Sequence, residues 1–249
     1  MKQLCCSFLC LALVSGSMGP LLGLDELDSR LDPHNASLFQ FVRIRYNGYL
    51  DFWSMGRWGP PPWMHDYPRA ERNFLKILLE MTSIETTTDS YIILDMDDPQ
   101  IMNHPIVYVS EPGYWNITDK EADNLREYLS RGGFVIFDDF RGVSEWNNLA
   151  GAMRKVLPDR SFQELRLDHP VFHCFYDIET LDMVPPYGVP GKPAFHGILD
   201  QQGRLLAIAN YNNDIGDYWE WADDSLTPVN LSNEAFKFGI NYIIYGMTH

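Results

Sequence analysis

The chain has 249 residues and a formal net charge of −15, and 45% of its residues are hydrophobic. This length and composition suffice for one sizeable hydrophobic core and exclude a chain that is disordered throughout. The strong negative charge argues against nucleic-acid phosphates and anionic membrane surfaces as partners.

The first nineteen residues have the pattern of an export signal. Lys2 gives a positive start, residues 4–14 form an apolar run, and residues 15–19 are mostly small. The apolar run is too short to span a bilayer comfortably, so a cleaved signal is favoured over an N-terminal membrane anchor. We therefore expect a periplasmic or secreted protein with no stable membrane span, in which residues 20–38 are a polar lead-in and residues 39–249 form a single domain.

Cysteine usage agrees with this organisation. Cys174 is the single cysteine beyond the predicted signal, so the mature chain has no intrachain disulfide and no cysteine metal cluster. Its neighbours Phe172, Phe175 and Tyr176 predict a small core residue rather than a nucleophile.

Strand and helix patterns alternate from residue 39 to about residue 180. Residues 39–46 alternate like a first strand, and Asp66 is expected to cap the next helix. Thr118 and Glu121 form a capping box for a second helix, which a glycine pair beginning at Gly132 ends. The other elements expected in this part are strands at 91–94, 106–109, 134–137 and 162–167 and a helix at 146–156.

Beyond residue 180 the pattern changes. Apolar runs at 194–199 and 204–209 flank the turn at 200–203, which predicts an antiparallel hairpin, and residues 233–245 have the apolar face of a final helix. Strands that alternate with helices form βαβ units around a parallel sheet. The predicted fold is therefore a single three-layer α/β domain with a mostly parallel sheet and a late antiparallel hairpin.

A long aromatic loop follows the first strand. It contains Trp53, Trp58 and Trp63 together with the prolines 60–62. Loops of this length in compact domains tend to be functional or to bind partners. We expect the Trp53–Trp63 loop to bind an envelope protein or a small ligand, and the alternative is a loop that packs over the core.

Polar side chains gather where the predicted strands end, which is where open parallel sheets bind ligands. Asp138, Asp139 and His169 are the candidate catalytic residues, since paired carboxylates and imidazoles carry acid–base chemistry. Asp139, His169 and Asp214 are the candidate ligands of a divalent cation. The alternative is that these residues only form turns and caps. The candidate ligand-binding residues are Tyr46, Arg69, Arg72, Asp168, Asn210 and Asp214.

The two arginines stand out in so acidic a chain. Arg69 and Arg72 follow Asp66 in the stretch DYPRAERNF. They are suited either to ion pairs with neighbouring aspartates or to binding a carboxylate or phosphate ligand.

Common catalytic motifs are absent from the sequence. We find no G-x-S-x-G, G-x-x-x-x-G-K-[ST], G-x-G-x-x-G or H-E-x-x-H pattern. α/β hydrolases and amidotransferases place a Ser or Cys nucleophile directly after a central strand. In this sequence that place is occupied by Asp138, Asp139 and Phe140. The sequence indicates no cofactor, although its carboxylates are compatible with a bound divalent cation.

Five separated motifs follow one another in order along the chain: YPRAERNF (67–74), LREYLSRGGFVIFDDF (125–140), PDRSFQELRLDHPVF (158–172), GRLLAIANYNNDIGD (203–217) and FGINYIIYGMT (238–248). Together they resemble the bacterial family called domain of unknown function 4159. The resemblance covers about residues 39–248 and implies a flavodoxin-type, class I glutamine-amidotransferase-like fold in a secreted or membrane-attached protein. The glycine-led strand and the later His-Pro turn are also distantly similar to trehalose-utilisation-type domains. The Cys-His-Glu triad of true amidotransferases is missing, so glutaminase activity is not carried over.

Two functions are consistent with the sequence. The favoured hypothesis is a non-catalytic envelope protein that binds a partner or small ligand, because the crevice is retained without a recognisable nucleophile. The alternative is a metal-assisted or carboxylate-based hydrolase that acts on a glycan or peptide.

Overall fold

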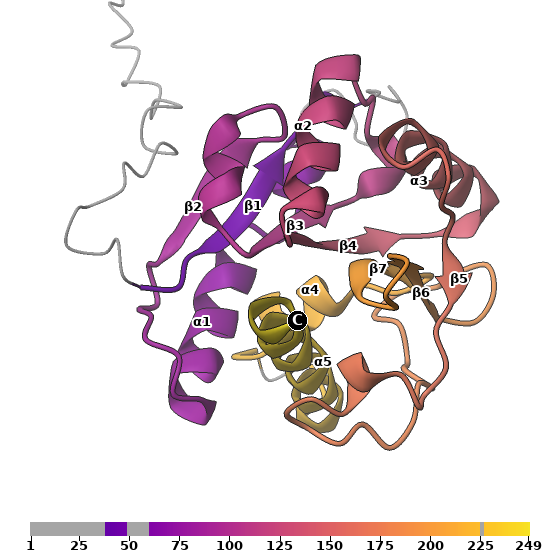
Figure 1. Ribbon diagram of the computed structural model, residues 1–249. Coiled ribbons are helices and arrows are strands. Elements are labelled where there is room, and N and C mark those ends of the chain that lie inside the picture. The colour runs from indigo at the N-terminus through magenta and orange to yellow at the C-terminus, as the bar shows by residue number, and fades with distance from the viewer. Residues whose placement is uncertain (1–37, 49–59, 225–226) are drawn as a thin grey trace, which may run out of the picture.

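A computed structural model describes residues 38–48, 60–224 and 227–249 (Figure 1). The predicted export signal, the lead-in up to residue 37 and residues 49–59 of the Trp53–Trp63 loop lie outside the described residues. Within the described ranges no helix has both the length and the apolar character that a membrane crossing requires.

The centre of the domain is one seven-stranded sheet with the strand order β2-β1-β3-β4-β7-β6-β5. Five neighbouring strands are parallel, whereas β6 runs antiparallel to β7 and β5 antiparallel to β6. The predicted α/β fold with a mostly parallel sheet and a late hairpin is therefore confirmed, and the 2-1-3-4 start of the strand order is flavodoxin-like. The strands are β1 (Phe41–Arg45), β2 (Tyr91–Asp95), β3 (Ile106–Ser110), β4 (Phe134–Phe140), β5 (Gln163–Glu164), β6 (Ala194–Leu199) and β7 (Leu205–Tyr211).

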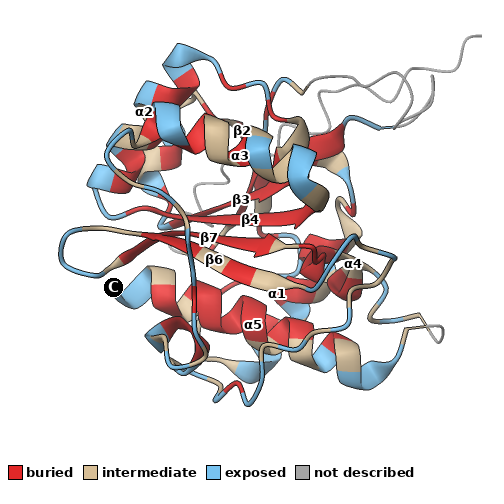
Figure 2. Cartoon of the chain, turned by 90° about the vertical axis from the view of Figure 1, so that its right-hand side faces the viewer, coloured by how far each residue is buried: buried red, intermediate tan, exposed pale blue. Residues whose placement is uncertain are grey.

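Helices cover both faces of the sheet and complete the three layers (Figure 2). Helices α2 and α3 lie on one face, and α1, α4 and α5 lie on the other. Alternation along β3 serves both layers, because Val107 faces the α2–α3 core whereas Tyr108 faces the α1–α5 core. The helices are α1 (Arg69–Met81), α2 (Asp119–Ser130), α3 (Gly142–Val156), α4 (Ile215–Glu220) and α5 (Val229–Thr248).

Two helix starts test the sequence predictions. The capping box of α2 is confirmed, since the Thr118 side chain accepts from the Glu121 backbone N–H and Glu121 accepts from the Thr118 N–H. The predicted cap of α1 is wrong. The helix begins at Arg69 after Pro68 without a side-chain cap, and Asp66 lies two residues earlier in a left-handed conformation with φ of 65°.

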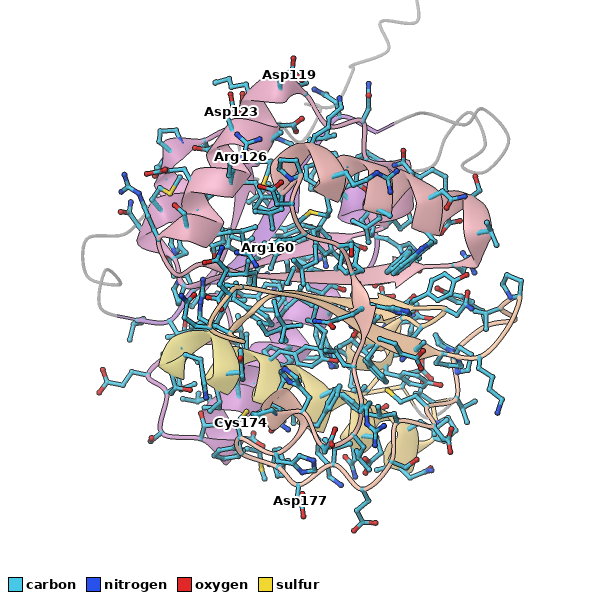
Figure 3. All side chains as sticks on the ribbon, turned by 45° about the vertical axis from the view of Figure 1, so that its right-hand side comes forward. Asp119, Asp123, Arg126, Arg160, Cys174 and Asp177 are labelled. Carbon is cyan, nitrogen blue, oxygen red and sulfur yellow. The ribbon has the colours of Figure 1, made fainter. Side chains whose placement is uncertain are left out.

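Arginine side chains join the elements on the α2–α3 side (Figure 3). Arg126 of α2 donates to the backbone oxygens of Lys155 and Val156 at the end of α3. Arg160 donates to the Leu199 carbonyl of β6. On the other side, the half-buried thiol of Cys174 donates to the Asn241 carbonyl of α5, and burial raises its pKa, so it does not have the character of a reactive thiolate.

Two elements differ from the predicted ones near the sheet edges. The strand predicted at 162–167 is only the two-residue edge strand β5, whose residues are exposed. The segment after β7 was expected to be a polar strand end, but it folds into the short helix α4, and Asn212, Asn213 and Asp214 before it are buried. As a result, the carboxyl edge around β4 and β7 is built mainly from buried polar groups.

Candidate metal centre

Four acidic or imidazole side chains meet beyond the carboxyl ends of the central strands. His65 and Asp66 come from the segment between β1 and α1, Asp139 from the end of β4, and Asp214 from the segment between β7 and α4. One donor atom from each of the four lies within 4.8 Å of the others. The structure thus brings together the predicted residues Asp139 and Asp214, with two partners that the sequence analysis did not select as ligands.

The histidine is held by the carboxylate of β4. His65 Nδ1 lies 2.8 Å from Asp139 Oδ2 and 3.2 Å from Asp66 Oδ1. The hydrogen bond to Asp139 raises the pKa of His65 to about 10. Burial alone would raise the pKa of Asp139, but the contacts with His65 and the Tyr187 hydroxyl, which donates to Oδ1 at 2.6 Å, bring it below its ordinary value. Asp139 is therefore an ionised carboxylate inside a buried site.

The other two carboxylates have oxygens that no donor satisfies. Asp66 is 6% exposed, and neither of its oxygens accepts a hydrogen bond within the described residues. Asp214 is fully buried; its Oδ1 accepts from the Asp217 N–H, whereas its Oδ2 has no partner in the same part of the chain. Burial, together with the neighbouring charge of Asp139, raises the pKa of both carboxyls well above the ordinary value. Buried carboxylate oxygens without donors are costly, and a coordinated cation would satisfy them.

Asp138, the neighbour of Asp139, is differently placed. Its carboxylate accepts from the Tyr108 hydroxyl, the Asn210 side-chain amide and the backbone N–H groups of Ile215 and Gly216, at 2.8 to 3.3 Å. Burial still raises its pKa to about 6. These four donors connect β3, β4, β7 and α4, so Asp138 holds the site together and has no oxygen left for a ligand.

Left-handed backbone is concentrated around this site. Among the described residues, the non-glycine positions with positive φ are Asp66 (65°), Glu111 (47°), Asp139 (54°) and Asn212 (54°). Asp139 lies near the end of β4 and the other three lie in segments that follow strands, all on the same edge of the sheet, and the ladder between β4 and β7 is irregular between Phe137 and Phe140. Such conformations cost free energy and are typical of functional sites.

A buried arginine positions the segment that carries His65. Arg43 of β1 donates from Nη1 to the carbonyl oxygens of Trp63, at 3.0 Å, and His65, at 2.8 Å. Its Nε forms a buried ion pair with Glu71 of α1. One guanidinium thus contacts both α1 and the backbone of the segment that carries His65 and Asp66. These contacts fix the position of the two residues relative to β1.

Two charged residues border the cluster. Glu111, after β3, is half-buried, and burial together with the charge of Asp139 raises its pKa to about 8. The Arg141 guanidinium lies 3.8 Å from the centre of the Tyr187 ring and forms no ion pair or hydrogen bond within the described residues. Tyr187 in turn contacts Asp139, so the positive group of Arg141 stands beside the candidate metal ligands.

Two of the predicted ligand-binding residues, Asn210 and Tyr46, form internal hydrogen bonds next to the site. Asn210 donates to Asp138 and accepts from the Tyr242 hydroxyl at 3.0 Å. The buried hydroxyl of Tyr46 donates to the carbonyl oxygens of Ser110 and Glu111, at 2.9 and 2.6 Å. Both are close to the centre, but their polar atoms are used within the protein.

The remaining predicted residues lie elsewhere. Arg69 pairs with Asp223 and stacks on Trp221, and Arg72 pairs with Asp89, so both serve the surface of α1. The exposed Asp168 faces Arg166. His169 packs against Phe172 and Tyr245, and the Tyr245 hydroxyl accepts from the Leu205 N–H at the start of β7. The structure therefore does not bring His169 to Asp139 and Asp214.

His65 and Asp66 had a signal that the sequence analysis passed over. They are adjacent ligand-type residues in the aromatic segment PPPWMHDYP, directly before a helix. The expected partner-binding loop ends at Trp63, and Asp66 is expected only to cap a helix. Long loops that follow strands at a ligand-binding edge are a common source of functional residues, and this context could have included both.

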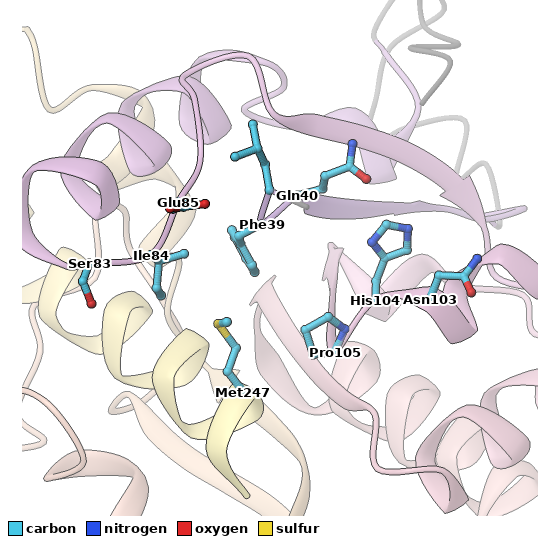
Figure 4. A pocket seen from close by; sticks show the side chains of 10 residues that line it. Phe39, Gln40, Ser83, Ile84, Glu85, Asn103, His104, Pro105 and Met247 are labelled. Atoms are coloured by element: carbon cyan, nitrogen blue, oxygen red, sulfur yellow. The ribbon is translucent and has the colours of Figure 1, made fainter. Parts of the chain in front are cut away.

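A separate pocket lies at the opposite, amino-terminal edge of the sheet (Figure 4). It has a volume of about 690 Å³ and is lined by residues before β1 and β3 and by Met247 of α5. Its walls include His104 and Glu85, and among the described residues no cluster of metal-binding side chains lies there. It adjoins Leu38, the first described residue, and the chemistry of the candidate metal centre does not extend to it.

The fold and the site define a class of protein: a three-layer α/β domain with a histidine- and carboxylate-lined centre at the carboxyl edge of its sheet. The chain belongs to the family described as Domain of unknown function (DUF4159), whose family model matches residues 40–247. The resemblance to this family noted from the sequence motifs is thereby confirmed. No curated protein matches the chain.

Proposed function

We propose that this domain binds a divalent metal ion through His65, Asp66, Asp139 and Asp214 and uses it for metal-assisted hydrolysis. The observation that carries the proposal is the convergence of four donor atoms within 4.8 Å, in a cluster whose Asp66 and Asp214 carboxyls each have a buried oxygen without a donor among the described residues. A cation at this point would neutralise carboxylates that otherwise repel one another.

The donor set favours a transition metal over calcium. One imidazole and three carboxylates suit Mn²⁺, Fe²⁺ or Zn²⁺, whereas Ca²⁺ prefers oxygen ligands alone. His65 is 46% exposed, which leaves one side of the site open to a water molecule or substrate. In the absence of metal, His65 carries a proton, so binding must release it.

The residues at the border suit a hydrolytic role. A metal ion held by these four residues would lower the pKa of a coordinated water and so would supply the nucleophile. Glu111, with a pKa of about 8, is placed to accept its proton, and Arg141 is placed to bind a substrate oxyanion. In the overall reaction the water oxygen would bond to the carbonyl or glycosidic carbon, the bond from that carbon to the leaving nitrogen or oxygen would break, and the leaving group would take a proton from the water. A glycan or a peptide remains the substrate class proposed.

The metal proposal is tested by calorimetry on the purified protein after treatment with a chelator. Mn²⁺ and Zn²⁺ are titrated into the wild type and into Asp139→Asn and His65→Gln, which should bind at least 10-fold more weakly. Asp168→Asn and His169→Gln are matched controls, since they make the same chemical changes outside the cluster and should leave affinity unchanged. No saturable binding by the folded wild type, or equal losses in the controls, would overturn the proposal.

A non-catalytic ligand- or partner-binding domain is the second candidate. It is favoured by two observations. Asp138 accepts hydrogen bonds from four internal donors and so has no oxygen left for catalysis, and the end of β4 carries no Ser or Cys nucleophile. Kinship with class I amidotransferase-like and trehalose-utilisation-type domains remains part of the proposal. It is supported by Asp139, which stands with a φ of 54° on a strand-to-helix turn, where related enzymes carry their nucleophile. Metal binding without metal-dependent turnover of chromogenic glycosides, esters or peptides would favour this second candidate.

The cellular setting is also proposed from the sequence. The N-terminal pattern supports export to the periplasm or beyond, and the Trp53–Trp63 loop supports contact with an envelope partner or small ligand. Fractionation of cells that express the full chain tests the first proposal. For the second, deletion of the loop tip should abolish recovery of a partner from envelope extract.

A further inference from the structure

We infer that the centre holds two metal ions, with the Asp66 carboxylate bridging them and with Asp217 and Glu220 of α4 as ligands of the second ion. This inference rests on the proposed function, because it adds a second ion beside the first. It changes the expected chemistry, since paired ions can stabilise both the attacking and the leaving oxygen in hydrolysis.

Two ligand groups meet at one residue. The first consists of His65, Asp66, Asp139 and Asp214, and the second consists of Asp66, Asp217 and Glu220, each with one donor atom per residue within 4.8 Å of the others. Asp66 is the member that both groups share. A shared carboxylate is the usual bridge when two ions lie about 3.5–4 Å apart.

The two oxygens of Asp66 have different neighbours, one from the first group and one from α4, the helix that carries Asp217 and Glu220. Oδ1 lies 3.2 Å from His65 Nδ1, on the side of the first group. Oδ2 lies beside Gly216 of α4, where a Cβ on that glycine would be 2.9 Å from it. Only 6% of the Asp66 surface is exposed, and neither oxygen accepts a hydrogen bond within the described residues. A carboxylate so placed, with no donor, is suited to bridging two cations.

The second group has the openness that a substrate-facing ion needs. Asp217 and Glu220 are half-buried and lie one helical turn apart on α4, on the same side of that helix. Asp217 Oδ1 accepts from the Trp221 indole N–H at 2.9 Å, which orients the carboxylate and leaves Oδ2 for a ligand. A carboxylate oxygen of Glu220 lies within 4.8 Å of oxygens of Asp66 and Asp217. In the described part of the chain, no arginine or lysine forms an ion pair with any of these three carboxyl groups.

The inference predicts stoichiometry and magnetic coupling. Calorimetry of the chelator-treated wild type with Mn²⁺ should give two ions per chain. The electron paramagnetic resonance spectrum of the loaded protein should show a spin-coupled pair instead of the six-line signal of isolated Mn²⁺. Glu220→Gln and the double variant Asp217→Asn/Glu220→Gln should each bind one ion and show the uncoupled signal, while the first ion remains bound. Asp223→Asn is the matched control on the neighbouring surface and should keep two coupled ions.

The outcomes separate this inference from the proposed function. One tightly bound ion in the wild type, or two ions without coupling, would overturn the two-ion inference and leave the single-metal proposal standing. Two coupled ions in the double variant would likewise overturn the assignment of Asp217 and Glu220. Failure of the folded wild type to bind any metal would overturn the proposed function itself. The wild-type spectrum decides the matter even if a variant does not fold.

Discussion

His65 Nδ1 and Asp139 Oδ2 lie 2.8 Å apart, although 74 residues separate them in the chain. The contact joins the segment after β1 to the end of β4, two strands away in the sheet. It couples the protonation of an exposed imidazole to a buried carboxylate, and this coupling has a measurable consequence for stability.

In the metal-free protein, this pair should make stability depend on pH. The pKa of His65 is raised to about 10 in the folded state, whereas an unfolded histidine titrates near 6.5. The stabilisation is therefore fully present below pH 6.5 and is lost as the pH rises towards 10. Urea unfolding with a chelator present should show wild type more stable than His65→Gln at pH 6, with a difference that shrinks towards pH 10. A difference that stays constant with pH would contradict the assignment.

Asp138 and Asp139 should respond differently to the same substitution. Asp138→Asn leaves two of the four buried donors facing an amide N–H₂ group, so we expect a loss of about 2–3 kcal/mol in the free energy of unfolding. Asp139→Asn should cost about 1 kcal/mol, because its partner His65 is partly exposed, and yet should abolish tight metal binding. Denaturant unfolding and metal titration measure the two effects. Equal behaviour of the two variants in both assays would reject the separate roles.

Gly216 is expected to be essential for the geometry of the centre. A Cβ there would lie 2.7 Å from the Tyr108 hydroxyl and 2.9 Å from Asp66 Oδ2. Gly216→Ala should therefore destabilise the protein by about 1–3 kcal/mol and weaken metal binding, although alanine favours helices. Gly151→Ala in α3 is the control, because the nearest atom to its Cβ, on Arg154, is 3.7 Å away. The control should stabilise by about 0.5–1 kcal/mol. Unchanged stability and metal affinity in Gly216→Ala would show that the Tyr108 and Asp66 side chains move aside for the added Cβ.

Arg43 should contribute to the site through more than its ion pair. Arg43→Met leaves Glu71 buried without a partner, which typically costs about 3–5 kcal/mol. The double variant Arg43→Met/Glu71→Leu should recover most of that stability, since both charges are gone. It should still bind metal about 10-fold more weakly, because the Trp63 and His65 carbonyls have lost their donor. Full recovery of metal affinity in the double variant would assign Arg43 to stability alone.

Arg141 is expected to bind anions once the metal is in place. Its guanidinium stacks on Tyr187 and has no ion pair among the described residues, so it is available to an oxyanion. Inorganic phosphate should bind the Mn²⁺-loaded wild type at least 5-fold more tightly than it binds Arg141→Gln. Arg72→Gln, which removes an arginine paired with Asp89, should match the wild type. Equal phosphate affinity in all three proteins would exclude this role, and metal titration of Arg141→Gln provides the check that the centre is intact.

Local patterns in the sequence predicted much of the fold. The capping box at Thr118 and Glu121 depends on residues three positions apart, and the hairpin around residues 200–203 depends on a four-residue turn. The apolar run before Asp138 predicted a buried strand, and β4 is buried along its whole length. The predicted cap of α1 is wrong because Asp66, although of a residue type that caps helices, has a φ of 65° and follows a segment that Arg43 holds through the Trp63 and His65 carbonyls.

For the candidate site, the order of residues along the chain was enough to predict that carboxylates follow β4 and β7. Asp139 and Asp214 come together because the side chains at the ends of parallel strands share one edge of the sheet. Long-range packing, in contrast, determines that Asp138 accepts from four internal donors, that His169 lies against Tyr245, and that His65 and Asp66 complete the centre. These outcomes depend on how Arg43 holds the segment after β1 and on where α4 begins, and such long-range contacts leave no periodic trace in the sequence.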